Sequence, residues 1–298
     1  MLRVTSNSYY SRILTNINQN QSNLIQTRMR IASGKKVQYL SDEPTKMGSL
    51  LKHKELIKKN DQYMENLSNA MDYLSVASDA LNHASDLLTT VRSLTVQGID
   101  SISTDEYASF ATQIDDFLSE LMDVANTRFK GKYVFAGTST TSQPFTMAGD
   151  RSSVAVTATG INGKQRLEIG THQIETINIS GHDAFLQNVD TFNLLIQLRD
   201  AFQNEDQATL ESLLPQLDTA LDQVLTSATR AGSLLNRFEL LHQQYESENV
   251  TLKHFTSKIE DADLYEESIN LQKQEMSLQA ALTVTAKGMD LSLVNYLR

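Results

Sequence analysis

The stretch from Leu210 to Leu252 reads LESLLPQLDTALDQVLTSATRAGSLLNRFELLHQQYESENVTL, and it determines the fold class we expect. Apolar or small residues return in it at alternating spacings of four and three. The positions are Leu210, Leu214, Leu217, Leu221, Val224, Ala228, Ala231, Leu235, Phe238, His242, Tyr245, Asn249 and Leu252. A seam that keeps its phase over so many heptads is typical of a long helix that packs against other helices along its whole length. On this seam, we interpret His242 as a core or edge histidine.

Composition narrows the class of protein. The chain has 298 residues, 40% of them hydrophobic, so it is long enough to bury a core. Its 36 acidic and 26 basic residues give a formal net charge of -10. Nucleic acids and anionic membranes attract positive surfaces, so we expect no nucleic acid and no membrane as partners, and protein partners instead. Cysteine is absent, which excludes disulfides and thiolate metal sites.

The N-terminal residues do not resemble a targeting segment. Residues 1–32 interleave polar and apolar side chains and lack the apolar core of a secretory signal. No window approaches the ~18 continuous apolar residues of a membrane span. If the protein leaves the cell, we expect another machinery to export it without a cleaved signal peptide.

An amphipathic helix is predicted at the N-terminal end. Its heptad face consists of Tyr10, Ile13, Ile17, Asn20, Leu24, Thr27 and Ile31. The polar residues Asn20 and Thr27 interrupt this stripe, so the helix would be marginal alone. Gly34 favours a left-handed helix stop, and the run Ser41-Asp42-Glu43-Pro44 favours a new helix start.

The next helices have a cleaner pattern. One seam alternates large and small residues, which lets neighbouring helices approach closely. It consists of Leu67, Ala70, Leu74, Ala77, Leu81, Ala84, Leu88 and Val91. We expect Gly98 to end this helix. A further apolar face follows at Tyr107, Phe110, Ile114, Phe117, Leu121 and Val124, and the short loop before it predicts an antiparallel hairpin.

The periodicity changes at Gly131. The residues that follow are rich in Gly, Ser, Thr and β-branched side chains, with strand-like pieces at 154–157, 165–169 and 173–179. Asn162-Gly163, between two of these pieces, predicts a tight hairpin turn. We expect a small β-rich domain inserted between helical halves.

Helix is predicted again from about Asp190, and Pro215 either starts the long helix or kinks it.

The last segment, which begins at Ile259, carries two apolar stripes, which indicate two contacts, one within the chain and one beyond it. The first stripe consists of Leu264, Leu271, Leu278, Leu282 and Met289, and the second of Ile269, Met276 and Ala280. The C-terminal residues, which include Leu293 and Leu297, are apolar, and an apolar terminus usually packs against another surface.

The chain shows no pattern that would support catalysis. No two of its six histidines have metal-ligand spacing on one helix face, and it contains no P-loop and no G-x-S-x-G motif. Asp261 and Asp263 begin like a calcium loop, but the glycine and closing glutamate of that loop are missing, which favours a helix cap. We therefore expect no enzyme, no catalytic residue, no metal and no cofactor.

A basic cluster stands out in this acidic chain. It consists of Lys52, Lys54, Lys58 and Lys59. A solvated helix face is the simpler interpretation, and contact with an acidic neighbour is the alternative.

Several short motifs carry a resemblance to a known family. Ala32-Ser33-Gly34-Lys35-Lys36 followed by Ser41-Asp42-Glu43-Pro44 resembles the joint between the two N-terminal helices of bacterial flagellins and their relatives. Arg230-Ala231-Gly232 with Asn236-Arg237-Phe238-Glu239 resembles the C-terminal long helix of these proteins, and the run from Ile259 to Asp263 resembles the start of their final helix. The run from Gly131 to Thr138, with Pro144-Phe145, is more similar to the hook-associated members than to flagellin itself.

This resemblance implies a mainly α fold, a long antiparallel helical bundle or coiled coil built from both chain ends with a small inserted β domain. It implies a terminal coiled-coil domain for assembly (1–36 plus 259–298), a long helical bundle (37–130 plus 189–258) and the β-rich insert (131–188). The terminal stripes would then stack on neighbouring subunits. The expected assembly residues are Tyr10, Ile13, Ile17, Leu24, Ile31, Leu271, Leu278, Leu282, Met289, Leu293 and Leu297.

The resemblance further implies a structural subunit at the junction of hook and filament, exported through the flagellar secretion channel to an extracellular position. Its implied partners are hook-associated protein 1, flagellin, other copies of the chain in a ring, and an export chaperone. Two alternatives stay open. One is a filament subunit, and the other is a coiled-coil adhesion or signalling module whose β insert binds a ligand.

Overall fold

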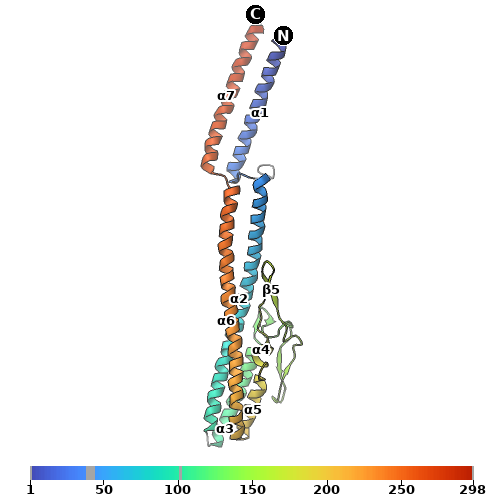
Figure 1. Ribbon diagram of the computed structural model, residues 1–298, viewed down its shortest axis with the longest axis vertical. Helices are drawn as coiled ribbons and strands as arrows, with labels where there is room; N and C mark the ends of the chain where they lie inside the picture. Colours follow the sequence, from blue (N-terminus) through green and yellow to red (C-terminus); the bar gives the residue numbers. More distant parts are fainter. Residues whose placement is uncertain (1, 38–43, 101–102, 297–298) are drawn as a thin grey trace. The chain divides into compact units, whose positions relative to one another are not determined.

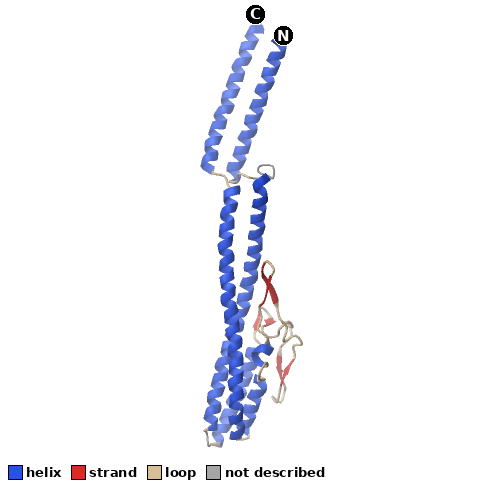
Figure 2. Ribbon diagram, in the orientation of Figure 1, coloured by secondary structure: helices blue, strands red, loops and turns tan. Residues whose placement is uncertain are grey.

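The structure is a computed structural model that describes residues 2–37, 44–100 and 103–296, with side chains for 11–37, 45–100 and 103–287. The predicted fold class is confirmed, because long helices from both chain ends account for most of the chain and a small β region lies between them in sequence (Figures 1 and 2). The chain divides into two compact units. Residues 1–58 with 248–298 form the terminal unit, and residues 59–247 form the central unit.

In the terminal unit, α1 (Leu2–Ser33) and α7 (Leu264–Tyr296) lie side by side and antiparallel (Figure 1). Ile17 and Leu24 of the predicted α1 seam are buried, and so is Thr27. The helix ends at Ser33 because Gly34 takes a φ of +69°, a left-handed conformation that favours glycine. The predicted helix stop is therefore confirmed.

Two long helices contribute to both units, α2 (Pro44–Ile99) and α6 (Gln207–Glu260). The start of α2 at Pro44 agrees with the prediction, whereas the cap candidates Ser41 and Asp42 lie outside the described residues. All eight seam positions predicted between Leu67 and Val91 are at most 1% exposed. Alternating leucine and alanine therefore forms the α2 side of the core, as the heptads predict.

The prediction that Gly98 ends α2 is wrong by one residue, because the helix continues to Ile99. A Cβ atom at Gly98 would lie 2.2 Å from Cε1 of Phe202, so the glycine allows α2 to approach the buried Phe202 ring closely. The glycine serves this contact rather than a helix stop.

Two shorter helices complete the helical part of the central unit. α3 (Thr104–Ala125) packs along α5 (Thr191–Gln203). α5 begins after Asp190, whose Oδ1 accepts the backbone N–H groups of Phe192 at 3.1 Å and Asn193 at 3.0 Å. This cap satisfies two amide donors that have no partner inside the helix, and it confirms the predicted return of helix at Asp190.

The long helix predicted from the opening seam is α6, and it begins at Gln207. Pro215 therefore lies inside α6 and does not start it. His242 on the seam is partly buried and Asn249 is buried, so the heptad phase continues through both polar positions.

The β region consists of three separate antiparallel sheets of two strands each (Figure 2). The first pairs β1 (Arg128–Phe129) with β2 (Lys132–Tyr133), the second β3 (Phe145–Met147) with β4 (Val154–Val156), and the third β5 (Arg166–Gly170) with β6 (Gln173–Thr176). A short helix, α4 (Gly181–Phe185), follows. The strand-like pieces in the sequence correspond to β4, β5 and β6.

A cluster of aromatic rings joins this region to the helices. Phe145 packs against Phe192 of α5 at a centroid distance of 4.7 Å, and Phe185 packs against Phe135 at 5.4 Å. All four rings are buried. Because small sheets bury little apolar area by themselves, these rings supply the core on which the β region folds.

The hairpin turn predicted at Asn162-Gly163 is wrong. The strand before it, β4, pairs with β3, and the strand after it, β5, pairs with β6. The side chain of Asn178 donates to the carbonyl of Gly163 at 2.9 Å and accepts the N–H of Gln165 at 2.8 Å, so a tertiary contact holds this loop. No helix within the described ranges is long and apolar enough to span a membrane.

Candidate functional site

The residues predicted for assembly lie on α1 and α7. Ile17 and Leu24 are buried, and Leu282 is 49% exposed. The partly buried members are Ile13, Ile31, Leu271 and Leu278. Tyr10 belongs to α1, and Met289 and Leu293 to α7, but their side chains are not described, and Leu297 lies outside the described residues. The pairing of α1 with α7 thus brings the central members of the set together, while their role in assembly stays a prediction.

Polar contacts accompany the pairing of α1 with α7. Arg30 of α1 lies 3.5 Å from the carboxylate of Glu267, a buried residue of α7. Arg28 forms an ion pair with Glu275 at 2.8 Å, with both side chains about half exposed. Exposed pairs contribute little to stability, on the order of 0–1 kcal/mol, but charged pairs between helices set their register.

The face of α7 that points away from α1 carries a row of exposed apolar side chains. We call Tyr265, Ile269, Met276 and Ala280 the outer stripe, because their spacing of four, seven and four residues places them on one side of the helix. Tyr265 is 78% exposed, Met276 64% and Ile269 37%. The contacts with α1 come from the opposite side, where Glu267, Leu271 and Leu278 are buried or partly buried. The terminal unit therefore leaves a second apolar face available for a partner.

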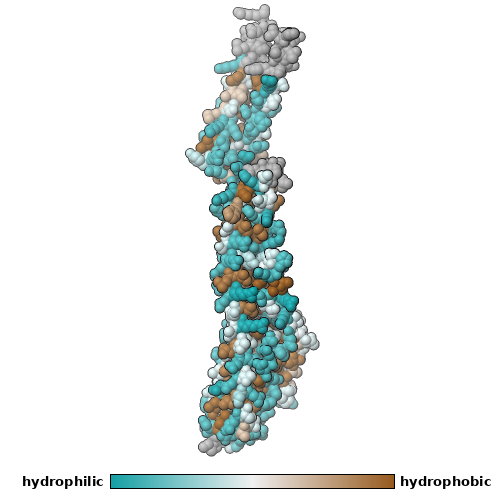
Figure 3. All heavy atoms as spheres, in the orientation of Figure 1, coloured by the Kyte–Doolittle hydropathy of each residue, from teal (hydrophilic) through white to brown (hydrophobic). Residues whose placement is uncertain are grey.

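A smaller uncovered face exists on α1. It consists of Leu14, Ile25 and Met29, which are 59%, 55% and 41% exposed. On the face of the molecule drawn in Figure 3, hydrophobic side chains form separate patches among hydrophilic ones. Apolar side chains aligned on a helix face are a feature of surfaces that become buried on association.

Between the paired helices and the long helices, the chain forms a joint around the carboxylate of Glu260, the last residue of α6. Nζ of Lys35 lies 2.6 Å from Oε1, and Nζ of Lys54 on α2 lies 2.7 Å from Oε2. Burial alone would raise the pKa of Glu260, but the hydrogen bonds and charges of the two lysines outweigh burial and lower this pKa. The hydrogen bond to Glu260 in turn raises the pKa of Lys35. The joint is thus a buried carboxylate held between two cations.

Backbone hydrogen bonds strengthen the same joint. The carbonyl of Glu260 accepts the N–H of Lys36 at 2.6 Å, and Gly34 accepts the N–H of Ala262 at 2.9 Å. Asp263 then caps α7, since its Oδ1 accepts the N–H of Tyr265 at 2.9 Å. The interpretation of this acidic run as a helix cap is confirmed for Asp263.

Glu260 is the residue of the joint whose role sequence reasoning missed. The acidic run at 259–263 and the basic cluster at 52–59 are both visible in the sequence, but nothing in either indicates that they meet. All three of Lys52, Lys54 and Lys58 are exposed, and of these Lys54 contacts an acidic neighbour, Glu260. Both interpretations of the cluster therefore hold, each for different lysines.

Charged side chains inside the central unit link its elements to one another. Asp115 of α3 binds Arg151 at 2.9 Å and the buried Arg199 of α5 at 3.2 Å, which ties the loop after β3 to two helices. Among the described residues, no group of three or more His, Asp or Glu side chains could hold a metal ion.

The chain resembles known proteins over both helical ends. Residues 4–140 match the family described as the bacterial flagellin N-terminal helical region, and residues 214–297 match the bacterial flagellin C-terminal helical region. Together these ranges cover well over half of the chain. They contain α2, α3 and α7 and most of α1 and α6, and the residues of the joint fall within them.

Two curated relatives differ in how much they share with this chain. Flagellar hook-associated protein 3 of Salmonella typhimurium is 25% identical over 149 residues, which is 49% of this chain and 47% of that protein. The match thus spans less than half of the length of this relative. Flagellin of Bacillus subtilis is 22% identical over 296 residues, 96% of each chain.

A solved structure shares the fold. The flagellar junction protein FlgL from Legionella pneumophila superposes with a TM-score of 0.60 at 14% identity, over 72% of this chain and 100% of that chain. At this identity the likeness concerns the fold alone.

Proposed function

Because the chain belongs to the bacterial flagellin family, whose two helical regions match it at both ends, we propose that it is a structural subunit of the flagellum that joins the hook to the flagellin filament. In this role it performs no catalysis and holds no cofactor. Its proposed partners are hook-associated protein 1 on one side, flagellin on the other, and copies of itself in a ring.

The observation that carries this proposal is the outer stripe on α7. Fully burying a large apolar side chain contributes about 1.5–3 kcal/mol, and Tyr265 and Met276 are both more than half exposed in the single chain. A subunit that buries this stripe against its neighbours gains that free energy only when it assembles. Of the expected assembly residues on both terminal helices, some would then pack within the α1–α7 pair and others would pack between subunits.

Similarity to hook-associated protein 3 and to a junction structure favours the junction over the filament itself. We further propose three domains, with the terminal coiled coil (1–36 plus 259–298) for assembly, the long bundle (37–130 plus 189–258) and the β-rich insert (131–188). Export through the flagellar secretion channel, with an export chaperone and without a cleaved signal peptide, would place the protein outside the cell.

Deleting the gene in its own bacterium tests the role. A junction subunit is required for filament attachment and not for the hook, so the mutant should keep intact hooks, lack filaments and release unpolymerised flagellin into the medium. Electron microscopy of hook–basal bodies and immunoblots of culture supernatant measure these outcomes. Expression of the intact chain should restore filaments, which serves as the control.

The second candidate is a filament subunit, favoured by the match to flagellin over 96% of both chains. In that case, the deletion would remove filaments without releasing another flagellin, and the purified chain would polymerise into long filaments. Either result would contradict the junction role.

A further inference from the structure

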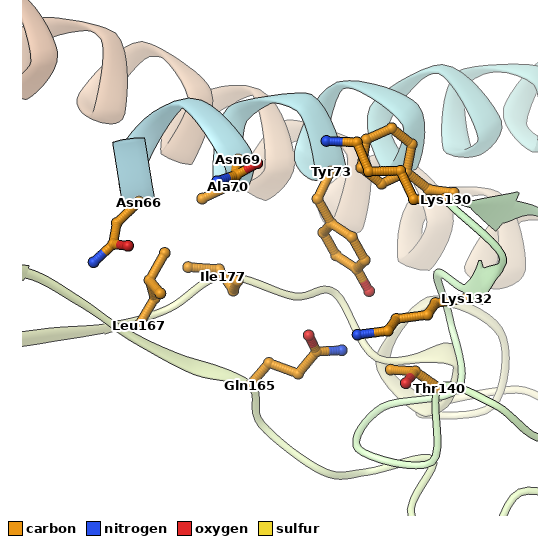
Figure 4. A pocket seen from close by; sticks show the side chains of 11 residues that line it. Asn66, Asn69, Ala70, Tyr73, Lys130, Lys132, Thr140, Gln165, Leu167 and Ile177 are labelled. Atoms are coloured by element: carbon orange, nitrogen blue, oxygen red, sulfur yellow. The ribbon is translucent and has the colours of Figure 1, made fainter. Parts of the chain in front are cut away.

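A cavity of about 430 Å³ opens between α2 and two of the hairpins of the β region (Figure 4). Asn66, Asn69 and Tyr73 line it from one face of α2, at helical spacings of three and four. The β1–β2 hairpin contributes Lys130 and Lys132, and the third hairpin contributes residues on and beside β5 and β6. A cavity of this size is in the range of about 300–1,000 Å³ that small-molecule sites occupy.

The cavity is lined by basic and neutral residues, although the chain as a whole is acidic. None of its eleven lining residues is acidic, although the chain carries 36 acidic and 26 basic residues. The ammonium of Lys132 points into the cavity toward Gln165 and the Tyr73 hydroxyl (Figure 4), and it makes no ion pair with any residue that the structure describes. Lys130, by contrast, lies 3.5 Å from Asp72 and over the ring of Phe129. Lys132 is therefore the cation available to an anionic ligand.

Neutral polar groups surround this cation. The Asn66 amide donates to the carbonyl of Glu168 at 2.8 Å, and its Oδ1 accepts from the Gln62 amide at 3.2 Å. The Asn69 amide donates to the carbonyl of Glu65 at 3.1 Å, which leaves its Oδ1 as an acceptor. Tyr73 donates its hydroxyl to the carbonyl of Val134, and burial raises its pKa to about 12, so the ring stays neutral. The site thus combines one positive group with an amide acceptor suited to a ligand hydroxyl.

Apolar side chains complete the lining. They are Ala70, Phe129, Leu167 and Ile177. A ligand with one carboxylate, several hydroxyl groups and a partly apolar ring face satisfies all three kinds of surface. A doubly charged phosphate would fit less well, because Lys132 is the one lining cation without a carboxylate partner among the described residues.

We propose that this cavity binds an acidic sugar, either free or as a residue of a polysaccharide, with its carboxylate on Lys132 and a hydroxyl on Asn69. Such a site would give the insert a recognition role of its own. The proposal does not depend on the junction role, because it concerns the central unit of the isolated chain.

Isothermal titration calorimetry of the full chain tests the site with D-glucuronate, D-glucose and polyglucuronate. We expect glucuronate to bind at one site and glucose to bind at least about tenfold more weakly, since glucose lacks the carboxylate. Saturation by free glucuronate would identify the monosaccharide as sufficient. Saturation by polyglucuronate alone would identify a polysaccharide as the source, and both results support an acidic sugar.

Three variants separate the cavity from general charge effects. Lys132→Gln should weaken binding about tenfold, while Lys164→Gln, which removes an exposed lysine of the same insert outside the cavity, should leave the affinity within about twofold. Asn69→Tyr should abolish binding by filling the cavity from an exposed position on α2. An unchanged melting temperature in each variant confirms that the fold is intact.

Three results would overturn the site. They are no saturable heat with either acidic probe, equal losses in Lys132→Gln and Lys164→Gln, and competition by inorganic phosphate as strong as that by glucuronate. Motility and filament attachment do not enter these measurements, so failure here leaves the junction role untouched.

Discussion

Glu260 and Lys54 are separated by 206 positions in the chain, and the lysine ammonium lies 2.7 Å from the glutamate carboxylate. Lys35 approaches the same carboxylate from the other side at 2.6 Å. One buried acid therefore connects the segment after α1 to α2 and to the end of α6. The ion pairs of the joint meet on this single carboxylate, which makes its ionisation a suitable subject for experiment.

Acid should loosen the joint. Since the folded protein lowers the pKa of Glu260 below its ordinary value of 4.5, the stabilisation is complete above that value and is lost as pH falls through the lowered pKa. On the alkaline side, the stabilisation from Lys35 is complete below its ordinary pKa of 10.5. It is lost as pH rises through the raised pKa, because the ammonium then loses its proton. The protection of the Lys36 amide against hydrogen exchange, relative to the intrinsic rate at each pH, should therefore fall at the acid limit, because this N–H donates to the carbonyl of Glu260.

Glu260→Gln should remove this acid dependence and destabilise the joint by about 1–2 kcal/mol at neutral pH, because both lysines lose a charged acceptor. The matched control is Glu266→Gln, an exposed carboxylate in the first turn of α7. Equal acid sensitivity of Glu260→Gln and the unaltered chain would show that another group controls the joint.

Gly34→Ala should destabilise the terminal unit by about 1–2 kcal/mol, because a φ of +69° is unfavourable for alanine. No atom lies within 4 Å of the added Cβ, so the effect comes from the backbone alone. Gly48→Ala provides the contrast, since Gly48 is an open helical position in α2 and alanine there should stabilise by about 0.5–1 kcal/mol. Hydrogen exchange at Lys36 and Ala262 measures both changes.

Gly98→Ala should destabilise the central unit by about 1–3 kcal/mol, because the new methyl would overlap the buried Phe202 ring. Gly232→Ala in α6 meets no atom within 4 Å and should stabilise slightly. Thermal unfolding followed by circular dichroism compares the two variants. The double variant Gly98→Ala/Phe202→Leu should recover part of the loss, and full additivity of the two changes would contradict a direct clash.

Met276→Glu should block assembly without unfolding the chain, since it places a charge in the middle of the outer stripe. Ser277→Glu adds the same charge at the next, exposed position outside the stripe and should assemble normally. In the deletion strain, the first variant should fail to restore filaments and the second should restore them. Restoration by both variants would exclude the outer stripe as an interface.

Removing residues 264–298 should block assembly and leave the central unit folded, because the central unit, residues 59–247, contains none of them. The cooperative melting transition by circular dichroism should persist in the truncated chain. Loss of that transition would contradict the proposed division into domains.

Regular packing was predictable from the sequence, and contacts between distant segments were not. The seam from Leu67 to Val91 is buried at every predicted position. It could be predicted because a helix that buries one side repeats apolar residues with the helical period. No sequence pattern predicts the contact between Glu260 and Lys54, since each residue alone resembles an ordinary solvated charge. The hairpin turn predicted at Asn162-Gly163 does not form for a related reason, because the contact with Asn178 outweighs the local turn preference.

The three small sheets of the insert rely on support from outside themselves. An isolated two-stranded hairpin is marginally stable in water, and here the supporting rings include Phe192 of α5. A fragment confined to the insert would therefore lack part of its hydrophobic core and should not fold on an unrelated scaffold. A chimera that exchanges this region between relatives has to include α5, because Phe192 of α5 belongs to that core.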